Sequence, residues 1–294
     1  MTPSDFAGAA GTWDLGDLTV NRLGFGAMRL TGSLPFAKGA PSDRDQSIEV
    51  LRRAVRLGVN HIDTAAFYFS ALRSANELIN SSLAPYPADL VITTKVGPGR
   101  DTWGEWHSAR PDQLRGQVEE NLRQLGRDQL DVVNLRRPAG LASIAEHFGA
   151  LAELRQAGLV RHLGVSDVTV GQLTEALLIA PVVCVQNRYG FDPREHDQVL
   201  RACAERGIAF VPFFAIAGQS RQSGRRPPEP GPLLAAAGRH GATPAQIRLA
   251  WTLHRSPNVL AIPGTGNVAH LEENVAAASI RLSAEDLALL DAAD

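Results

Sequence analysis

Residues 130–166 read LDVVNLRRPAGLASIAEHFGALAELRQAGLVRHLGVS, and this stretch decides the fold. Its two ends, LDVVNLR (130–136) and VRHLGVS (160–166), are short runs rich in β-branched residues, which favours strands. Between them, SIAEHFGALAELRQAG (143–158) has helical spacing and ends in glycine, the residue that most often caps a helix. Strand, helix and strand in this order predict a βαβ unit with two parallel strands.

The same pattern recurs along the whole chain, in eight strand–helix units with no break in composition between them. Eight units in about 250 residues fit a closed (β/α)8 TIM barrel better than an open doubly wound sheet. TWDLGDLTV (12–20) predicts a β-hairpin before the first barrel strand. We therefore predict one α/β domain over residues 1–294, with strands at 22–28, 59–63, 90–96, 130–136, 160–166, 182–187, 208–214 and 259–265, and helices at 42–58, 71–83, 110–126, 143–158, 169–180, 193–207, 243–256 and 268–277.

The composition is that of an ordinary globular protein. Of 294 residues, 44% are hydrophobic and 20% charged, and the net charge is -2, which argues against nucleic-acid binding. Cys184 and Cys203 lie in apolar surroundings without CxxC spacing, so buried thiols in a reduced, cytoplasmic protein are expected. No apolar run has transmembrane length and the start lacks signal-peptide features. The histidines are dispersed, which predicts no metal site, and nothing indicates a membrane or protein partner.

The predicted strands end in polar residues. Active sites of such barrels lie at the carboxyl ends of the strands. The alternation of side chains places Arg136 on the face of Asn134, which is expected to look into the barrel, and points Arg137 outward. The ring of inward residues comprises Asp63, Lys95, Arg136, Ser166 and Gln186, with Tyr68 in the loop after Asp63.

Asp63, Lys95 and Tyr68 suit proton transfer. A tyrosine hydroxyl has a reference pKa of about 10, and a neighbouring ammonium is expected to lower the pKa of Tyr68. A carboxylate would hold the lysine in place and keep it protonated. Tyr68 would then act as a general acid that protonates a developing alkoxide. The alternative is a structural ion pair with an unrelated tyrosine in the loop.

Five segments, taken in order, resemble the aldo-keto reductase superfamily. They are NHIDTAAFY with SANEL, ITTKVG, GVSD, VQNRY and IPGT…HLEEN, at 60–68, 74–78, 92–97, 164–167, 185–189, 262–265 and 270–274. The resemblance covers essentially the whole chain. It implies reversible hydride transfer from NADPH to an aldehyde or ketone. Asp63, Tyr68 and Lys95 would form the acid–base apparatus, with Tyr68 donating the proton.

The chain departs from that superfamily at Arg136. A segment like LHRP usually supplies a catalytic histidine, whereas this chain has LRRP. Arginine stays protonated and offers a planar fork of donors. Arg136 could stabilise the oxyanion, lower the pKa of Tyr68, or bind an anionic group of the substrate. The alternative is that it pairs with Asp63 or another acid and has no catalytic role.

The same arginine occurs in a narrower branch that the chain resembles, the bacterial pyridoxal reductases. The likeness is strong in GAMRL (26–30), VCVQN (183–187) and GIAFVPFF (207–214), and it implies reduction of pyridoxal to pyridoxine. The substrate loops are less alike. Trp103, Trp106 and His107 either face the substrate or cover the rim. Two alternatives remain, a reductase of a ketone in a specialised biosynthetic pathway and an NADP(H)-binding sensor with little turnover.

The resemblance also implies an NADP(H) site. Ser166 and Gln186 match the residues that hold the nicotinamide carboxamide, whereas Asp167 replaces the usual Asn and can only accept a hydrogen bond. Phe213 falls where a ring commonly stacks on the nicotinamide, or it packs in the core. The adenosine-phosphate segment supplies Gly264, Thr265, His270, Glu273 and Asn274, of which Gly264 and His270 stand where lysine and arginine are usual. NADPH is expected over NADH, and the loop at 219–230 could add Arg225 or Arg226.

Overall fold

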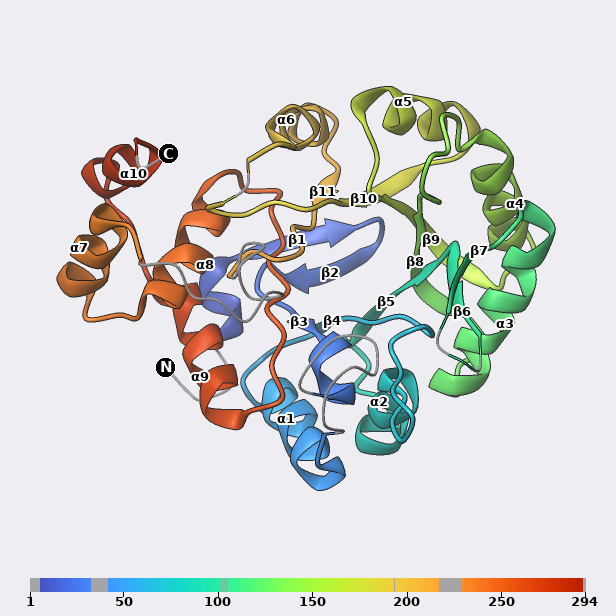
Figure 1. Ribbon diagram of the computed structural model, residues 1–294, viewed down its shortest axis with the longest axis horizontal. Helices are drawn as coiled ribbons and strands as arrows, with labels where there is room; N and C mark the ends of the chain where they lie inside the picture. Colours follow the sequence, from blue (N-terminus) through green and yellow to red (C-terminus); the bar gives the residue numbers. More distant parts are fainter. Residues whose placement is uncertain are drawn as a thin grey trace.

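The fold is a barrel of parallel strands ringed by helices, in a computed structural model that describes residues 6–32, 42–101, 103, 105–192, 194–216 and 229–292 (Figure 1). Its main sheet has seven strands in the order β11-β10-β9-β8-β5-β4-β3, and every neighbouring pair is parallel. The strands are β3 (Phe25–Gly26), β4 (His61–Asp63), β5 (Val91–Val96), β8 (Leu130–Arg136), β9 (Val160–Ser166), β10 (Val182–Gln186) and β11 (Ala209–Phe210).

The segment 259–261 closes the sheet into a barrel. Val259 pairs with Phe210 of β11, and Ala261 pairs with Leu23, which precedes β3, both in parallel register. The Leu260 amide donates to the Phe210 carbonyl over 2.9 Å, and the Gly24 amide donates to the Ala261 carbonyl over 2.8 Å. This eighth strand position completes the ring, so the predicted (β/α)8 barrel is confirmed.

Helices cover the outside of the barrel (Figure 1). Several begin with the side-chain caps that fix a helix start. Thr169 and Thr243 accept hydrogen bonds from Gln172 and Gln246 three residues later, in reciprocal capping boxes. The barrel helices are α1 (Arg44–Arg56), α2 (Ala75–Leu83), α3 (Leu114–Leu125), α4 (Ala145–Gln156), α5 (Val170–Ile179), α6 (Asp197–Glu205), α8 (Pro244–His254) and α9 (Val268–Ala276).

The predicted N-terminal hairpin consists of β1 (Thr12–Leu15) and β2 (Leu18–Asn21). It covers the end of the barrel opposite the carboxyl ends of the strands. Leu15 and Val20 are fully buried and pack with the barrel-interior cluster. Asp17 in the hairpin turn contacts Arg161 and His162 at the start of β9. Among the described residues, the hairpin therefore covers the amino-terminal end of the barrel, and the cavity lined by the strand-end residues lies at the opposite end.

The interior cluster also confirms which strand faces look inward. Val91, Val132 and Cys184 pack with the hairpin inside the barrel, whereas Val133 and Leu135 belong to the larger core between strands and helices. This is the alternation expected from the sequence, and it aims Arg136 at the mouth. Both cysteines are buried, as predicted.

Several further elements were not predicted from the sequence. They are α7 (Gly231–His240), α10 (Ala284–Asp291), the hairpin of β6 (Pro98–Arg100) and β7 (Trp106–Ser108), and the 3-10 turns η2 (Ala7–Ala10), η3 (Ala27–Thr31), η4 (Pro111–Gln113) and η6 (Ala277–Ser279). α7 and α10 pack together beyond α8 (Figure 1). Within the described ranges, every helix is too short or too polar to cross a membrane.

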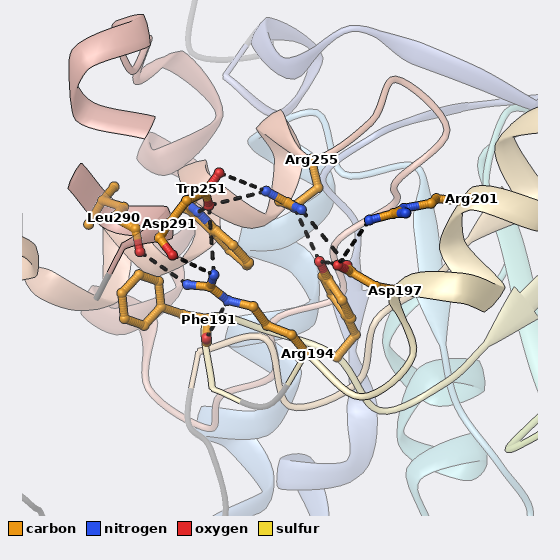
Figure 2. Close-up of polar contacts among 9 residues, drawn as sticks. Phe191, Arg194, Asp197, Arg201, Trp251, Arg255, Leu290 and Asp291 are labelled. Carbon is orange, nitrogen blue, oxygen red and sulfur yellow. Dashed lines mark hydrogen bonds and ion pairs between the residues drawn. The ribbon is translucent and has the colours of Figure 1, made fainter. Parts of the chain in front are cut away.

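The C-terminal helix is fastened by arginines around Trp251 of α8 (Figure 2). Arg194 donates to the carbonyls of Leu290 and Asp291 over 3.0 Å each, and Arg255 bonds the Asp291 carboxylate over 3.1 Å. Both guanidinium groups lie within 5 Å of the Trp251 ring, at 4.8 and 4.9 Å from its centroid. The end of α10 is thereby attached to the loop that follows β10.

Candidate active site

The carboxyl ends of the strands surround a cavity of about 340 Å³. Its wall brings together eight of the residues singled out from the sequence, namely Asp63, Tyr68, Lys95, Trp106, Arg136, Gln186, Phe213 and Gly264. Other lining residues were missed, among them Met28, Arg29, Phe67 and Phe214. Met28 and Arg29 lie in η3, the turn that begins at the carboxyl end of β3, so a search that extended just past each strand end would have found them.

A buried ion pair forms the floor of this cavity. Lys95 Nζ lies 2.5 Å from Asp63 Oδ1 and also donates to the Thr64 carbonyl over 2.9 Å. The two side chains are only 4% and 5% exposed, so each charge depends on the other. Burial is the largest single influence and opposes the charge on Lys95, but Asp63 and Tyr68 together outweigh it and raise the pKa of Lys95. Below the pair, burial lowers the pKa of His61 to about 4, so this imidazole is neutral.

Tyr68 lies over the same lysine, with Lys95 Nζ 4.9 Å from the centroid of its ring. The expectation that this ammonium lowers the pKa of Tyr68 is wrong for the net effect. Burial raises the pKa of Tyr68, and Lys95 and Arg136 offset this only in part while Asp63 adds to it. Because Asp63 neutralises much of the lysine charge, desolvation of the phenolate dominates. Tyr68 is therefore a protonated phenol at neutral pH.

Arg136 enters the cavity from the end of β8 and does not pair with Asp63. Its guanidinium lies 3.7 Å from Asp167 Oδ2, 3.4 Å from Ser166 Oγ, and 5.0 Å from the centroid of the Phe213 ring. Arg137 lies 3.6 Å from the same Asp167 oxygen. One acid thus faces two arginines. Arg136 thus pairs with an acid, Asp167, as the alternative interpretation of the sequence expected. It nevertheless lines the cavity, where a ligand can reach it.

Gln186 carries an unsatisfied acceptor. Its Nε2 donates to Asp63 Oδ2 over 2.8 Å, whereas its buried Oε1 accepts no hydrogen bond from the described residues. Ser166, at the end of the neighbouring strand β9, is fully buried. A buried acceptor without a donor is unfavourable unless a ligand supplies one, and an amide NH₂ would do so.

Gly264 is a glycine for a steric reason. A Cβ atom at this position would lie 2.4 Å from the Gly26 carbonyl oxygen. The backbone at position 264 therefore passes too close to β3 to carry a side chain. A lysine cannot stand at this point of the wall without moving the strand.

The remaining residues of the adenosine-phosphate segment do not line this cavity and lie just before α9 or within it. Asn267 caps α9 by accepting from the His270 amide, and Thr265 Oγ1 accepts from the Asn267 amide over 3.1 Å. Thr265 and Asn274 are mostly buried, whereas His270 and Glu273 are exposed. Arg225 and Arg226 lie outside the described residues.

The three aromatic residues expected at the rim, in the β6–β7 region, lie in three different environments. Trp106 lines the cavity and meets Phe67 edge to face, with ring centroids 5.7 Å apart. His107 faces a neighbouring cavity instead. Trp103 is 88% exposed and is not part of either wall. Of the three, only Trp106 can meet a ligand in the main cavity as the side chains stand.

Residues 22–294 match the model of the aldo/keto reductase family. The chain is 47% identical to pyridoxine 4-dehydrogenase of Escherichia coli over 290 residues, which are 96% of this chain and 98% of that protein. It is 40% identical to an uncharacterized oxidoreductase of Schizosaccharomyces pombe over 97% of this chain and 90% of that protein.

Solved structures agree. The thermostable aldo-keto reductase Tm1743, solved with the inhibitor epalrestat, superposes with a TM-score of 0.80 at 30% identity, covering 96% of this chain and 99% of that one. An aldo-keto reductase of Klebsiella pneumoniae, solved in complex with NADPH, gives a TM-score of 0.75 at 26% identity over 93% and 90% of the two chains. On sequence and fold together, this chain belongs to the aldo/keto reductase family.

Proposed function

We propose that this protein is an NADPH-dependent reductase that converts pyridoxal, or an aldehyde like it, to the alcohol. The observation that carries the proposal is the buried Asp63–Lys95 pair beneath Tyr68, at the mouth of a barrel of this family. Pyridoxal is chosen because the Escherichia coli relative, 47% identical over nearly its full length, is a pyridoxine 4-dehydrogenase. Residues 1–294 would act as one domain.

Tyr68 is the proposed proton donor. NADPH, when bound, supplies the hydride that reduces the carbonyl carbon. Tyr68 Oη gives its proton to the carbonyl oxygen, and its raised pKa means that the proton is present at neutral pH. Lys95 then stabilises the phenolate that remains on Tyr68. Asp63 holds Lys95 in place and keeps it charged, since it raises the pKa of the lysine.

The described residues fit this cofactor. The buried Oε1 of Gln186 is an acceptor without a donor, which suits the amide NH₂ of a nicotinamide carboxamide. Ser166, Asp167 and Phe213 all contact Arg136, which lines the same cavity as Gln186. The adenosine phosphate would be held near Gly264 and His270, by Thr265 together with main-chain amides, whereas Glu273 and Asn274 would contact the adenine.

Arg136 gives the pocket a permanent positive charge near the reacting carbonyl. Pyridoxal carries an acidic ring hydroxyl beside its aldehyde. A guanidinium in this position can bind that oxygen in its ionised form while Tyr68 protonates the neighbouring one. Trp106 and Phe67 offer ring edges and faces that suit an aromatic substrate.

The test is the loss of NADPH absorbance by the purified protein with pyridoxal, simple aldehydes and ketones, with NADH assayed in parallel. We expect NADPH-selective turnover with the highest kcat/KM for pyridoxal. Turnover of ketones with none of pyridoxal would refute the substrate assignment and keep the reaction. Tight NADPH binding without turnover of any carbonyl would favour a sensor.

A further inference from the structure

Arg136 contacts three groups that the proposed function assigns to the nicotinamide, namely Phe213, Ser166 and Asp167. We propose that Arg136 occupies the nicotinamide position in the coenzyme-free protein, and that its guanidinium moves to an anionic oxygen of the substrate when the coenzyme binds. This inference rests on the proposed function, because Phe213, Ser166 and Asp167 are taken as coenzyme contacts.

The spacing leaves no room for both groups. The Arg136 guanidinium carbon lies over the Phe213 ring, 5.0 Å from its centroid. Stacked carbon atoms need about 3.5–4.0 Å between them, so a ring lying between the two groups needs about 7 Å. A ring stacked on this face of Phe213 therefore requires Arg136 to withdraw by about 2 Å.

Arg136 is free to make this move. Its side chain is 32% exposed, its bond to Ser166 Oγ is long at 3.4 Å, and its pair with Asp167 is a partly exposed contact of 3.7 Å. Contacts of this kind contribute little individually. Asp167 keeps a partner after the move, because Arg137 lies 3.6 Å from the same oxygen and donates to the Asp167 carbonyl over 2.6 Å.

The cavity provides a reason for the new position. Among the described residues of its wall, the one carboxylate is Asp63, and both of its oxygens are already bonded, to Lys95 and Gln186. The displaced guanidinium thus meets no available acid there. It suits a carbonyl compound that carries a phenolate or carboxylate oxygen next to the carbonyl. Coenzyme and substrate affinities are then coupled, each raising the other by the same factor.

The first test measures NADP⁺ binding calorimetrically to the wild-type protein, Arg136→Met and Arg137→Met at one ionic strength. Arg137→Met is the matched control, because it removes an equal charge that contacts the same acid but does not line the cavity. We expect Arg136→Met to bind NADP⁺ about three to ten times more tightly, because a few weak contacts no longer compete. Arg137→Met should bind equally or more weakly.

The proposal would be overturned if Arg136→Met bound NADP⁺ more weakly than the wild-type protein, by the same factor as Arg137→Met. Arg136 would then act only through its positive charge, which attracts the phosphates of the coenzyme. Arg136→Gln, which keeps a polar side chain of intermediate length, serves as a second variant. This arm needs no turnover, so it stands apart from the identity of the substrate.

The second test measures binding of pyridoxine with and without saturating NADP⁺. We expect saturating NADP⁺ to lower the Kd for pyridoxine at least fivefold in the wild-type protein. In Arg136→Met we expect the Kd for pyridoxine to be the same with and without NADP⁺. Equal Kd values in the wild-type protein would refute the coupling. If pyridoxine fails to bind in both states, the proposed substrate fails, and the NADP⁺ measurement still decides whether Arg136 competes with the coenzyme.

Discussion

Gln186 Nε2 donates to Asp63 Oδ2 over 2.8 Å, while Lys95 occupies the other oxygen of the same carboxylate. One buried acid therefore orients both the lysine beneath Tyr68 and the amide whose free Oε1 faces the proposed carboxamide position. The proposed proton-transfer residues and the proposed coenzyme contact are therefore both held by Asp63. Changes at Asp63 are expected to affect stability, coenzyme affinity and catalysis together.

Asp63→Asn should destabilise the protein by about 3–5 kcal/mol, because it leaves a buried ammonium without its counter-charge. Turnover should fall by at least about a hundredfold, since Lys95 then loses its proton more easily and stabilises the Tyr68 phenolate less well. Urea unfolding and steady-state kinetics measure the two effects. A loss of activity with unchanged stability would show that the pair is not coupled in the folded state.

Tyr68→Phe should lower kcat by about 10²–10⁴, the usual contribution of a general acid. The ring remains in place, so the Kd for NADPH should change by less than about twofold. Fluorescence titration with NADPH separates the two quantities. Retained turnover would remove Tyr68 from the mechanism.

His61 should make stability depend on pH. Its pKa is about 4 in the folded protein against 6.5 ordinarily, so the unfolded chain binds a proton that the folded one excludes. Above pH 6.5 His61 is neutral in both states and the free energy of unfolding does not depend on it. As the pH falls from 6.5 toward 4, the unfolded chain takes up the proton and the free energy of unfolding decreases by about 3 kcal/mol in all. Urea unfolding between pH 4 and 7.5 should show this slope in the wild-type protein. His61→Gln should flatten it, and an identical slope in that variant would assign the effect to other groups.

Gly264→Ala and Gly149→Ala should have opposite effects. A Cβ at 264 would meet the Gly26 carbonyl at 2.4 Å, whereas a Cβ at 149, inside α4, meets nothing within 4 Å. We expect Gly264→Ala to destabilise by about 1–3 kcal/mol and to weaken NADPH binding. Gly149→Ala should stabilise by about 0.5–1 kcal/mol through helix propensity. Thermal unfolding of both variants with and without NADPH is the measurement, and a neutral Gly264→Ala would mean that the strand yields.

Arg194→Met should destabilise the protein by about 2–3 kcal/mol, because three carbonyl contacts and the packing on Trp251 are lost together (Figure 2). Arg201 is the matched control in the same network, since its side chain is 73% exposed and its ion pair with Asp197 is long at 3.8 Å. Arg201→Met should change stability by less than about 0.5 kcal/mol. If urea unfolding gave the same change in stability for both variants, the contacts of Arg194 would not be what holds α10 in place.

The sequence alone determined the barrel, the hairpin and the ring of strand-end residues. Side-chain alternation along a strand is a local property, so the inward direction of Asp63, Lys95 and Arg136 follows from which strand face is apolar. The helices α7 and α10 and the β6–β7 hairpin were missed. α7 and α10 pack on one another, which gives their short segments a buried face that no local pattern reveals.

Only the tertiary structure decided how the charges at the mouth are paired. It placed Asp167 between two arginines, set the pKa of Tyr68 above its ordinary value, and separated Trp103 and His107 from Trp106. It also showed that Gly264 faces a carbonyl of β3 and has no space for a side chain. Desolvation and Coulomb energies depend on distances between residues far apart in the chain, and these distances exist only once the barrel has closed.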